Sequence, residues 1–253
     1  QLDLLRGFRA PVSPDFEADT IYHCAASFSG DTLTGIRENY QTNAAGSLWV
    51  LELAGLTGCK SIIYAGSTSS TENAEPGNLS SYGFSKAQAE NLLTWGMTRV
   101  NGRFCSLRFS QIYDTAGMCI RHQPWLGRII AYTSRGMDLN MPASDGPRNF
   151  LHVDDAVALL LAAGMSSAAG ILDTTHPESL TYEEIAIKSY AIFGNGGTIT
   201  IDPDKTPFRR IDFPDASGTY KLLEKTPAVS IDAGITRIRD LNTWPDFGPL
   251  DVT

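Results

Sequence analysis

The hydrophobic positions of this chain first form short runs, separated by longer stretches with helical spacing. Residues 19–26, 60–67 and 103–113 are apolar runs rich in β-branched and aromatic residues, which is typical of buried strands. Between them, residues 34–58 and 82–100 place apolar side chains among good helix formers. Strand, helix, strand, helix and strand at these lengths predict βαβ units on a parallel sheet.

The pattern becomes less regular after Asp114. We expect helices over residues 126–134, 153–165 and 181–193 and an extended piece over 139–142. Short mixed elements after a regular parallel-sheet half indicate a smaller lobe beside a ligand crevice, which in open α/β sheets lies at the carboxyl ends of the strands. The predicted organisation is therefore a partial parallel-sheet domain over residues 1–114. Residues 115–253 would form mainly a substrate-binding lobe, with some segments returning to the first domain.

Composition narrows the classes of partner. The 253 residues carry a net charge of -8, which argues against a nucleic-acid or anionic-membrane surface and favours small-molecule ligands. No apolar run approaches the roughly 20 residues that span a bilayer, and the first residues lack the order of a signal peptide, so we expect a cytoplasmic protein. The four cysteines show no C-x-x-C spacing, and we interpret them as buried reduced thiols. The four histidines lie too far apart in the sequence to indicate a metal site.

Tyr82 and Lys86 are the first candidates for chemistry. They stand four residues apart in a predicted helix, so their side chains leave from the same face. A phenol with a pKa of about 10 is a poor base at neutral pH, and a neighbouring cation favours phenolate. Chance alone can produce one such pair, so the spacing gains weight only from its setting.

That setting is the carboxyl end of the strand over residues 60–67. Ser67 and Thr68 carry hydroxyls there, and either hydroxyl could hydrogen-bond a substrate oxygen. Ser69, Ser70 and Thr71 have a simpler interpretation as solvated turn residues.

Five ordered motifs resemble the extended short-chain dehydrogenases, particularly the nucleotide-sugar epimerases and their relatives. They are His23-Cys-Ala-Ala26, Asn43-Ala-Ala-Gly-Ser47, Ser67 with Tyr82-Gly-Phe-Ser-Lys86, Leu107-Arg-Phe109, and Arg148-Asn-Phe-Leu-His-Val-Asp-Asp155. The resemblance covers nearly the whole chain. It implies a Rossmann-like doubly wound parallel sheet whose first strands are missing, followed by a smaller substrate-binding lobe.

The resemblance also implies roles for individual residues. Ser67, Tyr82 and Lys86 match the catalytic triad, and Tyr82 and Lys86 also contact the cofactor, NAD or NADP. The other cofactor positions implied are Asp3, Ala25, Ala26 and Asn43. The substrate positions are Thr68, Gln111 and Arg148, and the Arg148 guanidinium suits the phosphate oxygens of a nucleotide sugar.

Several departures from the family pattern affect these implications. The glycine-rich G-x-x-G-x-x-G turn that accepts the pyrophosphate is not in this sequence, and we expect roughly 55–60 residues, about two βα units, to precede Asp3. Ser67 is followed by Thr68 and Ser69 rather than the Asp-Glu pair of sugar dehydratases, which disfavours dehydration. Gln111 stands where many relatives have asparagine, so the sugar cannot be assigned by resemblance.

These observations predict an NAD(P)-dependent nucleotide-sugar epimerase that acts by transient oxidation at a sugar carbon. Two alternatives stay open: an NAD(P)H-dependent carbonyl reductase with the same triad, and a non-catalytic relative that serves as a binding or assembly subunit. A homodimer through the helices over 39–56 and 82–100 is a further expectation from the family. For Asp154 and Asp155 we expect capping of the helix that follows, and for His152 a packed, hydrogen-bonded side chain.

Overall fold

The computed structural model describes residues 1–9, 12–13, 15–71, 79–144, 146–208, 210–248 and 250, so part of the predicted loop over 67–81 lies outside the described residues. The chain divides into two compact units. The first comprises Gln1–Phe109, Ala158–Thr174 and Asp215–Lys225, and the second Ser110–Val157, Thr175–Pro214 and Thr226–Thr253. Two later segments thus belong to the same unit as the first 109 residues.

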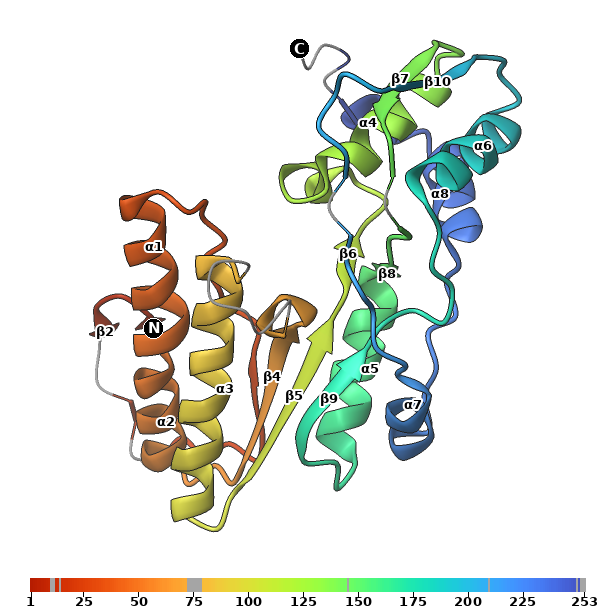
Figure 1. Ribbon diagram of the computed structural model, residues 1–253. Coiled ribbons are helices and arrows are strands. Elements are labelled where there is room, and N and C mark those ends of the chain that lie inside the picture. The colour runs from red at the N-terminus through yellow and green to blue at the C-terminus, as the bar shows by residue number, and fades with distance from the viewer. Residues whose placement is uncertain are drawn as a thin grey trace. The chain divides into compact units, whose positions relative to one another are not determined.

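The first unit is built on a parallel sheet in the order β3-β4-β5-β9. Its strands are β3 (Ile21–His23), β4 (Ser61–Ser67), β5 (Arg103–Phe109) and β9 (Gly170–Thr174). Helices α1 (Leu33–Asn39), α2 (Ser47–Leu56) and α3 (Ser81–Arg99) lie together at one face of β4 (Figure 1). Two short strands, β1 (Leu2–Asp3) and β2 (Gly7–Phe8), pair antiparallel, and α7 (Ser217–Leu223) completes the unit with the end of α5 (Val153–Met165).

The hydrophobic core of this unit explains why α2 and α3 pack against one face of β4 and β5. Apolar side chains at helical spacing on the two helices pack against side chains at alternate positions of β4 and β5, because a strand directs every second residue to the same side. The buried set is Val50, Ala54, Ala89, Leu93 and Met97 from the helices with Ile62, Tyr64 and Phe104 from the strands.

Two predicted elements are subdivided in the structure. The helix predicted over 34–58 consists of α1, a π-helical segment (Tyr40–Ala45) and α2. The strand predicted over 103–113 is β5 followed by β6 (Gln111–Tyr113), which pairs with β8 (Phe150–His152) in a different sheet. A continuous run of strand-forming residues cannot reveal this change, because both halves are strands and only their hydrogen-bond partners differ.

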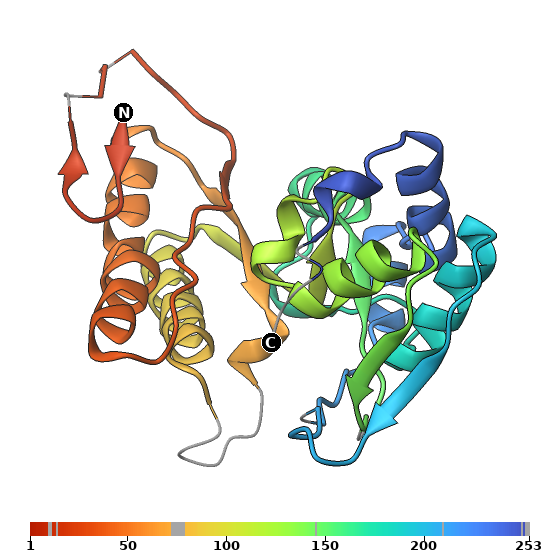
Figure 2. The ribbon, with the colours of Figure 1, turned by 90° about the horizontal axis from the view of Figure 1, so that it is seen from above.

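The second unit contains two short parallel pairs, β6 with β8 and β7 (Leu139–Pro142) with β10 (Ile199–Asp202). Figure 2 shows α4 (Pro124–Thr133), α6 (Tyr182–Phe193) and α8 (Ile231–Asp240) in the same unit as these pairs. Their buried side chains form one core; it includes Leu126, Ile130, Phe150, Ile185 and Ile235. Within the described residues, no helix is long and apolar enough to cross a membrane.

The start of α5 corrects the capping prediction. Asp155 accepts hydrogen bonds from the backbone N–H groups of Ala228 (3.0 Å) and Val229 (2.9 Å), and Asp154 binds Arg237 (3.0 Å). Neither carboxylate caps the helix, so that prediction is wrong. The buried His152 ring accepts from the N–H of Asp154 instead (3.2 Å), which confirms the packed, hydrogen-bonded histidine.

The cysteines need one correction as well. All four are free thiols, and Cys59, Cys105 and Cys119 are buried as expected. Cys24 is exposed, because it directly follows the short strand β3.

Arg103, the first residue of β5, closes the carboxyl end of α5. Its guanidinium donates to the backbone carbonyls of Ala163 (2.8 Å), Gly164 (3.2 Å), Ser166 (2.7 Å) and Ala168 (3.0 Å), and to the Ser61 hydroxyl at 2.6 Å. The last carbonyls of a helix have no partners within the helix, and a cation there also complements the helix dipole. Arg103 therefore connects α5 to the central strands.

We predict that Arg103→Ala lowers the free energy of unfolding by about 3 kcal/mol, because it removes charge-assisted hydrogen bonds from partly buried carbonyls. Arg103→Lys should restore less than half of the loss, since an ammonium cannot reproduce the planar fork. Urea denaturation followed by circular dichroism measures both, with the exposed Arg37→Ala as the control. Equal stability of the Arg103→Ala and Arg37→Ala variants would contradict the assigned role.

Candidate active site

Ser67 and Tyr82 meet where β4 ends and α3 begins. Ser67 is the last residue of β4, and α3 starts next to it because the Ser80 hydroxyl caps the helix by accepting from the N–H of Gly83 (3.1 Å). A Cβ at Gly83 would lie 2.2 Å from the Ser69 carbonyl, so the first turn of α3 packs against the end of β4, and the Ser67 side chain lies close enough to the Tyr82 phenol to act on its pKa. The structure therefore brings together two of the predicted catalytic residues, although they lie 15 positions apart in the sequence.

The electrostatics of Tyr82 differ from the prediction. Burial raises the pKa of Tyr82 above its ordinary value of 10, and the hydrogen bond with Ser67 opposes that rise. We expected Lys86 to lower this pKa, and that expectation is wrong for this structure. The reason is geometric, because the Lys86 ammonium is held by groups on the sheet.

Lys86 is a buried cation, with 2% of its surface exposed. Its Nζ donates to the backbone carbonyl of Ala65 at 2.6 Å and lies 4.1 Å from the centroid of the Tyr64 ring. Burial lowers the pKa of Lys86 from 10.5 to about 7, while the charges of Glu90 and Cys24 act in the opposite direction. The ammonium is thus poised to lose its proton near neutral pH.

Glu90, one helical turn after Lys86, provides a buried negative charge. Arg108 of β5 donates to its carboxylate through Nη2 (2.6 Å) and Nε (3.1 Å), and the Ser106 hydroxyl donates at 2.6 Å. Gly66 leaves room for this pair, because a Cβ at that position would lie 3.0 Å from the Glu90 carboxylate and 2.4 Å from Ser106 Oγ. The ion pair joins α3 to β5 directly below the Lys86 site.

Asn43, in the π-helical segment, joins the chain after β3 to α3. Its amide accepts from the N–H of Ser27 (2.7 Å) and donates to the carbonyl of the same residue (2.9 Å) and to the Ser85 hydroxyl (2.9 Å). The side chain is 1% exposed, so all of these bonds are protected from water. The resemblance assigned Asn43 to the cofactor site, and its observed contacts hold the backbone beside the catalytic helix.

Asn39 repeats this arrangement four residues earlier. Its amide accepts from the N–H of Ser29 (2.9 Å) and donates to the Ser29 carbonyl (2.8 Å) and the Ser81 hydroxyl (2.9 Å). Ser81 precedes Tyr82, so the two asparagines secure both the segment after β3 and the first turns of α3.

His23 and Tyr64 are buried polar rings beside this network. They are paired residues of β3 and β4, and their ring centroids are 5.1 Å apart. His23 Nε2 and the Tyr64 hydroxyl have no hydrogen-bond partner in the described part of the chain. Burial, aided by the nearby Lys86 charge, lowers the pKa of His23 from 6.5 to about 3, so the imidazole is neutral at physiological pH.

The predicted cofactor residues of the first unit fall into two places. Ala25 and Ala26 follow β3 at the carboxyl edge of the sheet and are exposed, so small side chains leave that edge open beside Lys86 and Tyr82. Asp3 is the last residue of β1, where it accepts from Arg9 Nη2 (3.0 Å) and from the N–H of Leu5 (2.9 Å), and Arg9 lowers its pKa.

Thr68 is buried and starts a short 3-10 turn, Thr68–Ser70. The N–H of Ser69 donates to Ser67 Oγ (3.2 Å), and the Thr71 hydroxyl donates to the Thr68 carbonyl (2.9 Å). This is the turn chemistry expected for Ser69 and Thr71. Ser70 is buried, and its hydroxyl has no hydrogen-bond partner in the described part of the chain, so the prediction of a solvated Ser70 is wrong.

Gln111 and Arg148 belong to the second unit, where both reach Tyr182. The Arg148 guanidinium lies 5.3 Å from the Tyr182 ring centroid and 5.8 Å from that of Phe208. Burial raises the pKa of Tyr182 while Arg148 and Gln111 lower it, and the Gln111 amide donates to Gln123 Oε1 at 2.7 Å. The sequence indicated Gln111 and Arg148 but gave no reason to select Tyr182.

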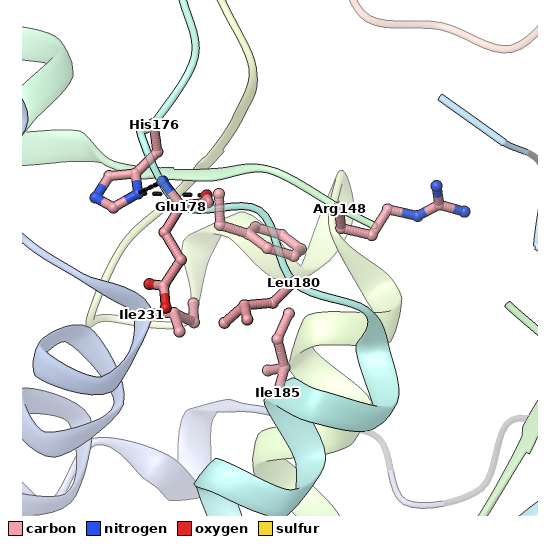
Figure 3. Close-up of a pocket in the computed structure, with 7 residues that line it drawn as sticks. Arg148, His176, Glu178, Leu180, Ile185 and Ile231 are labelled. Atoms are coloured by element: carbon pink, nitrogen blue, oxygen red, sulfur yellow. Dashed lines mark hydrogen bonds between the residues drawn. The ribbon is translucent and has the colours of Figure 1, made fainter. Parts of the chain in front are cut away.

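A small pocket adjoins Arg148 in the same unit. Its lining comprises Arg148, Phe150, His176, Glu178, Leu180, Ile185 and Ile231. Figure 3 shows the Arg148 guanidinium directed away from the apolar side chains, while His176 Nδ1 accepts from the N–H of Glu178 (3.0 Å). With an empty volume of about 190 Å³, this pocket is too small for a nucleotide sugar.

Three residues of the first unit were not found by sequence reasoning. The sequence could have indicated Glu90, since it continues the four-residue spacing from Tyr82 through Lys86. It could not have indicated Asn39 and Phe28, because their contacts with α3 depend on which segments lie side by side after folding.

A family model described as the NAD dependent epimerase/dehydratase family matches residues 6–171. No curated protein matches the chain.

Solved structures share the fold at low identity. UDP-N-acetylglucosamine 4-epimerase from Bacillus cereus is 20% identical with a TM-score of 0.75, and the match covers 88% of this chain and 79% of that one. UDP-glucose 4-epimerase from Thermotoga maritima, solved with UDP-glucose, is 21% identical with a TM-score of 0.72 and coverages of 88% and 77%. RMD from Pseudomonas aeruginosa, complexed with NADPH, is 20% identical with a TM-score of 0.74 and coverages of 96% and 87%. The predicted Rossmann-like α/β class is confirmed.

The buried neutral His23 should make stability depend on pH. Its pKa of about 3 in the folded chain lies below the unfolded value of 6.5, so the unfolded state binds more protons and stability falls as the pH drops through this window. Between pH 7 and pH 5 the His23 contribution should be a loss of about 2 kcal/mol. Urea unfolding at both pH values measures it.

His23→Phe supplies the comparison, because it keeps a ring against Tyr64 and removes the titrating group. The variant should lose about 2 kcal/mol less than the parent over the same interval, and all other titrating groups cancel in the difference. Identical pH dependence of the two proteins would show that His23 is not held neutral.

Proposed function

Since this chain belongs to the NAD dependent epimerase/dehydratase family of enzymes, we propose that it is an NAD(P)-dependent nucleotide-sugar epimerase acting by transient oxidation at a sugar carbon. The observation that carries the proposal is the position of Tyr82 near Ser67 at the end of β4, on the same helix that buries the Lys86 ammonium. A proton acceptor, a hydroxyl partner and a cation then lie at one end of the sheet, where α/β enzymes bind their ligands.

In this proposal Tyr82 takes the proton of the reacting sugar hydroxyl and later returns it. The Ser67 hydroxyl hydrogen-bonds the same sugar oxygen and holds it near the phenol. Burial raises the pKa of Tyr82, so its phenolate needs compensation. Lys86, one helical turn later on α3, is proposed to supply it once cofactor and substrate are bound. Glu90 keeps the Lys86 site charged by opposing the effect of burial on its pKa.

NAD or NADP, when bound, would supply the acceptor and donor of hydride. Lys86, Tyr82, Ala25 and Ala26 are the residues proposed to hold its reactive end, and Asp3 to lie toward its adenine. The sugar would carry a nucleoside diphosphate, and Arg148 is proposed to bind its phosphates, with Gln111 and Thr68 as further substrate contacts.

Two alternative functions are considered for the same site. A carbonyl reductase would need the same three catalytic residues and would release oxidised cofactor at each turnover. A non-catalytic binding subunit would bind ligand without a functional Tyr82. The proximity of Ser67 to Tyr82 favours the enzymes, and the epimerase is distinguished from the reductase by whether bound cofactor is consumed.

We predict that Tyr82→Phe lowers the rate of interconversion between UDP-glucose and UDP-galactose by at least about 100-fold, because it removes the acid/base hydroxyl. The assay incubates protein with NAD+ and UDP-glucose, repeats the incubation with UDP-N-acetylglucosamine, and measures epimer formation by chromatography. Tyr22→Phe removes a hydroxyl from β3 and should change the rate less than about twofold.

Turnover in Tyr82→Phe equal to that of the parent protein would contradict the proposed mechanism. Net production of NADH or consumption of NADPH in proportion to product would favour the reductase. Calorimetric binding of NAD+ without turnover of any nucleotide sugar would favour the non-catalytic subunit.

We also propose that the chain forms a homodimer through α1, α2 and α3. These helices and the π-helical segment between α1 and α2 expose large apolar side chains, among them Leu33, Ile36, Tyr40, Leu48, Leu56, Phe84 and Trp95. The Tyr40 and Phe84 rings stack at 6.5 Å, so the exposed apolar side chains continue from the π-helical segment to α3. An apolar surface of this kind on adjacent helices is typical of an interface between copies.

The double variant Leu48→Glu/Trp95→Glu should weaken dimerisation by at least about 100-fold, since it places charges in the centre of an apolar interface. Sedimentation velocity over a concentration series measures the shift toward monomer. Leu241→Glu, which changes an exposed leucine of the second unit, is the control. A monomeric parent protein at all concentrations would exclude the dimer.

A further inference from the structure

We infer that Arg108 is a positioning residue for the charge of Lys86: it holds the Glu90 carboxylate against β5 and so limits how strongly that carboxylate retains the proton of the buried ammonium. Glu90 and Arg108 would then act on the Lys86 charge in opposite directions. The consequence for turnover rests on the proposed function, because it assumes that a charged Lys86 supports Tyr82. The effect on Lys86 itself does not depend on that function.

Both oxygens of the Glu90 carboxylate accept from donors on β5. Arg108 Nη2 donates to Oε2 at 2.6 Å and Arg108 Nε to Oε1 at 3.1 Å, and the Ser106 hydroxyl donates to Oε1 at 2.6 Å. Ser106 and Arg108 are alternate residues of one strand, so their side chains leave from the same face. Charge-assisted hydrogen bonds from two side chains thus determine where the negative charge lies.

Consecutive residues of β4 lie against the two ionised groups of α3. Lys86 Nζ donates to the Ala65 carbonyl at 2.6 Å, and a Cβ at Gly66 would lie 3.0 Å from Glu90 Oε1. Gly66 is also the register partner of Arg108 on β5. Lys86 and Glu90 are therefore neighbours over one stretch of β4. The carboxylate acts on the ammonium by its charge, while its hydrogen bonds go to β5.

The other titratable groups that surround Lys86 in the described part of this unit are uncharged near neutral pH. They are His23 at the end of β3, Cys24 after it, Tyr64 on β4 and Tyr82 on α3. Burial lowers the pKa of His23 to about 3 and raises the pKa of Cys24, Tyr64 and Tyr82, so each group keeps its neutral form. Glu90 is therefore the charge that opposes burial at Lys86, and its position decides how well it does so.

Arg108 offsets part of that effect. Its guanidinium neutralises the carboxylate from the β5 side and holds it there, so the ammonium experiences a weaker negative charge. Arg108 also faces Asp173, its register partner on β9, and the Arg108 charge lowers the pKa of Asp173 against the effect of burial. Arg108 thus keeps a carboxylate neighbour when Glu90 is changed, whereas Glu90 without Arg108 has Lys86 as its cationic neighbour on α3.

This balance matters because the pKa of Lys86, at about 7, lies within the physiological range. A small change in the surrounding charge then changes the fraction of ammonium at neutral pH. Under the proposed function, the charged form supports the Tyr82 phenolate, so turnover falls as the pH rises through this pKa. The Glu90–Arg108 pair would set that upper limit.

The test is an NMR titration of Lys86 in the whole chain. Lysine labelled with 13C at Cε reports loss of the ammonium proton, and the Lys86 signal is the one missing from Lys86→Arg. Glu90→Gln should lower the titration midpoint by about one pH unit, because it removes an opposite charge one helical turn away. Arg108→Gln, which keeps a donor to the carboxylate, should raise the midpoint by about half a unit. Glu52→Gln and Arg37→Gln make the same charge changes at exposed positions of α2 and α1, and each should shift it by less than about 0.2 unit.

Opposite shifts distinguish the assigned role from a structural one. Both substitutions break the same ion pair, so a merely structural role would loosen α3, hydrate Lys86 and raise its midpoint in both variants. The double variant Glu90→Gln/Arg108→Gln should titrate within about 0.2 unit of Glu90→Gln, since Arg108 acts through Glu90. Shifts in the same direction, or an equal effect of Arg108→Gln with and without Glu90, would overturn the inference.

Ser106→Ala keeps the test decisive if Arg108→Gln does not fold, since removing one partner of a buried ion pair is destabilising. It removes a neutral donor from Glu90 Oε1 and should raise the Lys86 midpoint by about 0.3 unit. An unchanged or lowered midpoint in Ser106→Ala would reject the role of the β5 donors.

Turnover separates this inference from the proposed function. In the UDP-glucose assay with NAD+, the upper limb of the pH profile should move to lower pH in Glu90→Gln and to higher pH in Arg108→Gln. Opposite NMR shifts in a protein that turns over no nucleotide sugar would support the charge pair and reject the epimerase. Turnover by a protein whose Lys86 midpoint is the same in all variants would reject the charge pair and support the enzyme.

Discussion

The structure of the first unit depends on the burial of one ammonium group. Lys86 lies beneath α3 with almost no exposed surface, and a buried charge is costly unless other groups compensate it. The compensation comes from the Ala65 carbonyl, the Tyr64 ring and the more distant Glu90 carboxylate. These groups belong to β4 and to α3 itself, so the ammonium requires the helix to sit against this strand in one register.

That register decides where Tyr82 lies. Tyr82 is one turn before Lys86 on the same helix, so fixing the lysine on β4 brings the phenol to Ser67 at the end of that strand. The Glu90 pair with Arg108 extends the same attachment to β5. Three side chains at four-residue spacing on α3 thus face the sheet, and each makes a different polar contact with it.

The opposite side of α3 is fixed by neutral amides. Asn39 and Asn43 each bind a peptide unit of the segment after β3 and a serine hydroxyl of α3. An amide suits this task because it donates and accepts at once, and a carboxylate at the same place could only accept. The site therefore combines a charged attachment to the sheet with a neutral attachment to α1, and Tyr82 lies where the two meet.

The sequence by itself determined the class of fold and the approximate positions of β3, β4, α3 and β5, and it indicated Ser67, Tyr82 and Lys86 as candidates for one site. These follow from local periodicity and from short motifs, which depend on neighbours a few residues away. Tertiary structure decided what the sequence could not: the division of the strand over 103–113 between two sheets, the bonds of Asp155 to residues 73 and 74 positions later, and the contact of Phe28 with Tyr82. It also reversed the expected pKa shift of Tyr82, because burial and the direction of the lysine ammonium exist only after the helix has packed on the sheet.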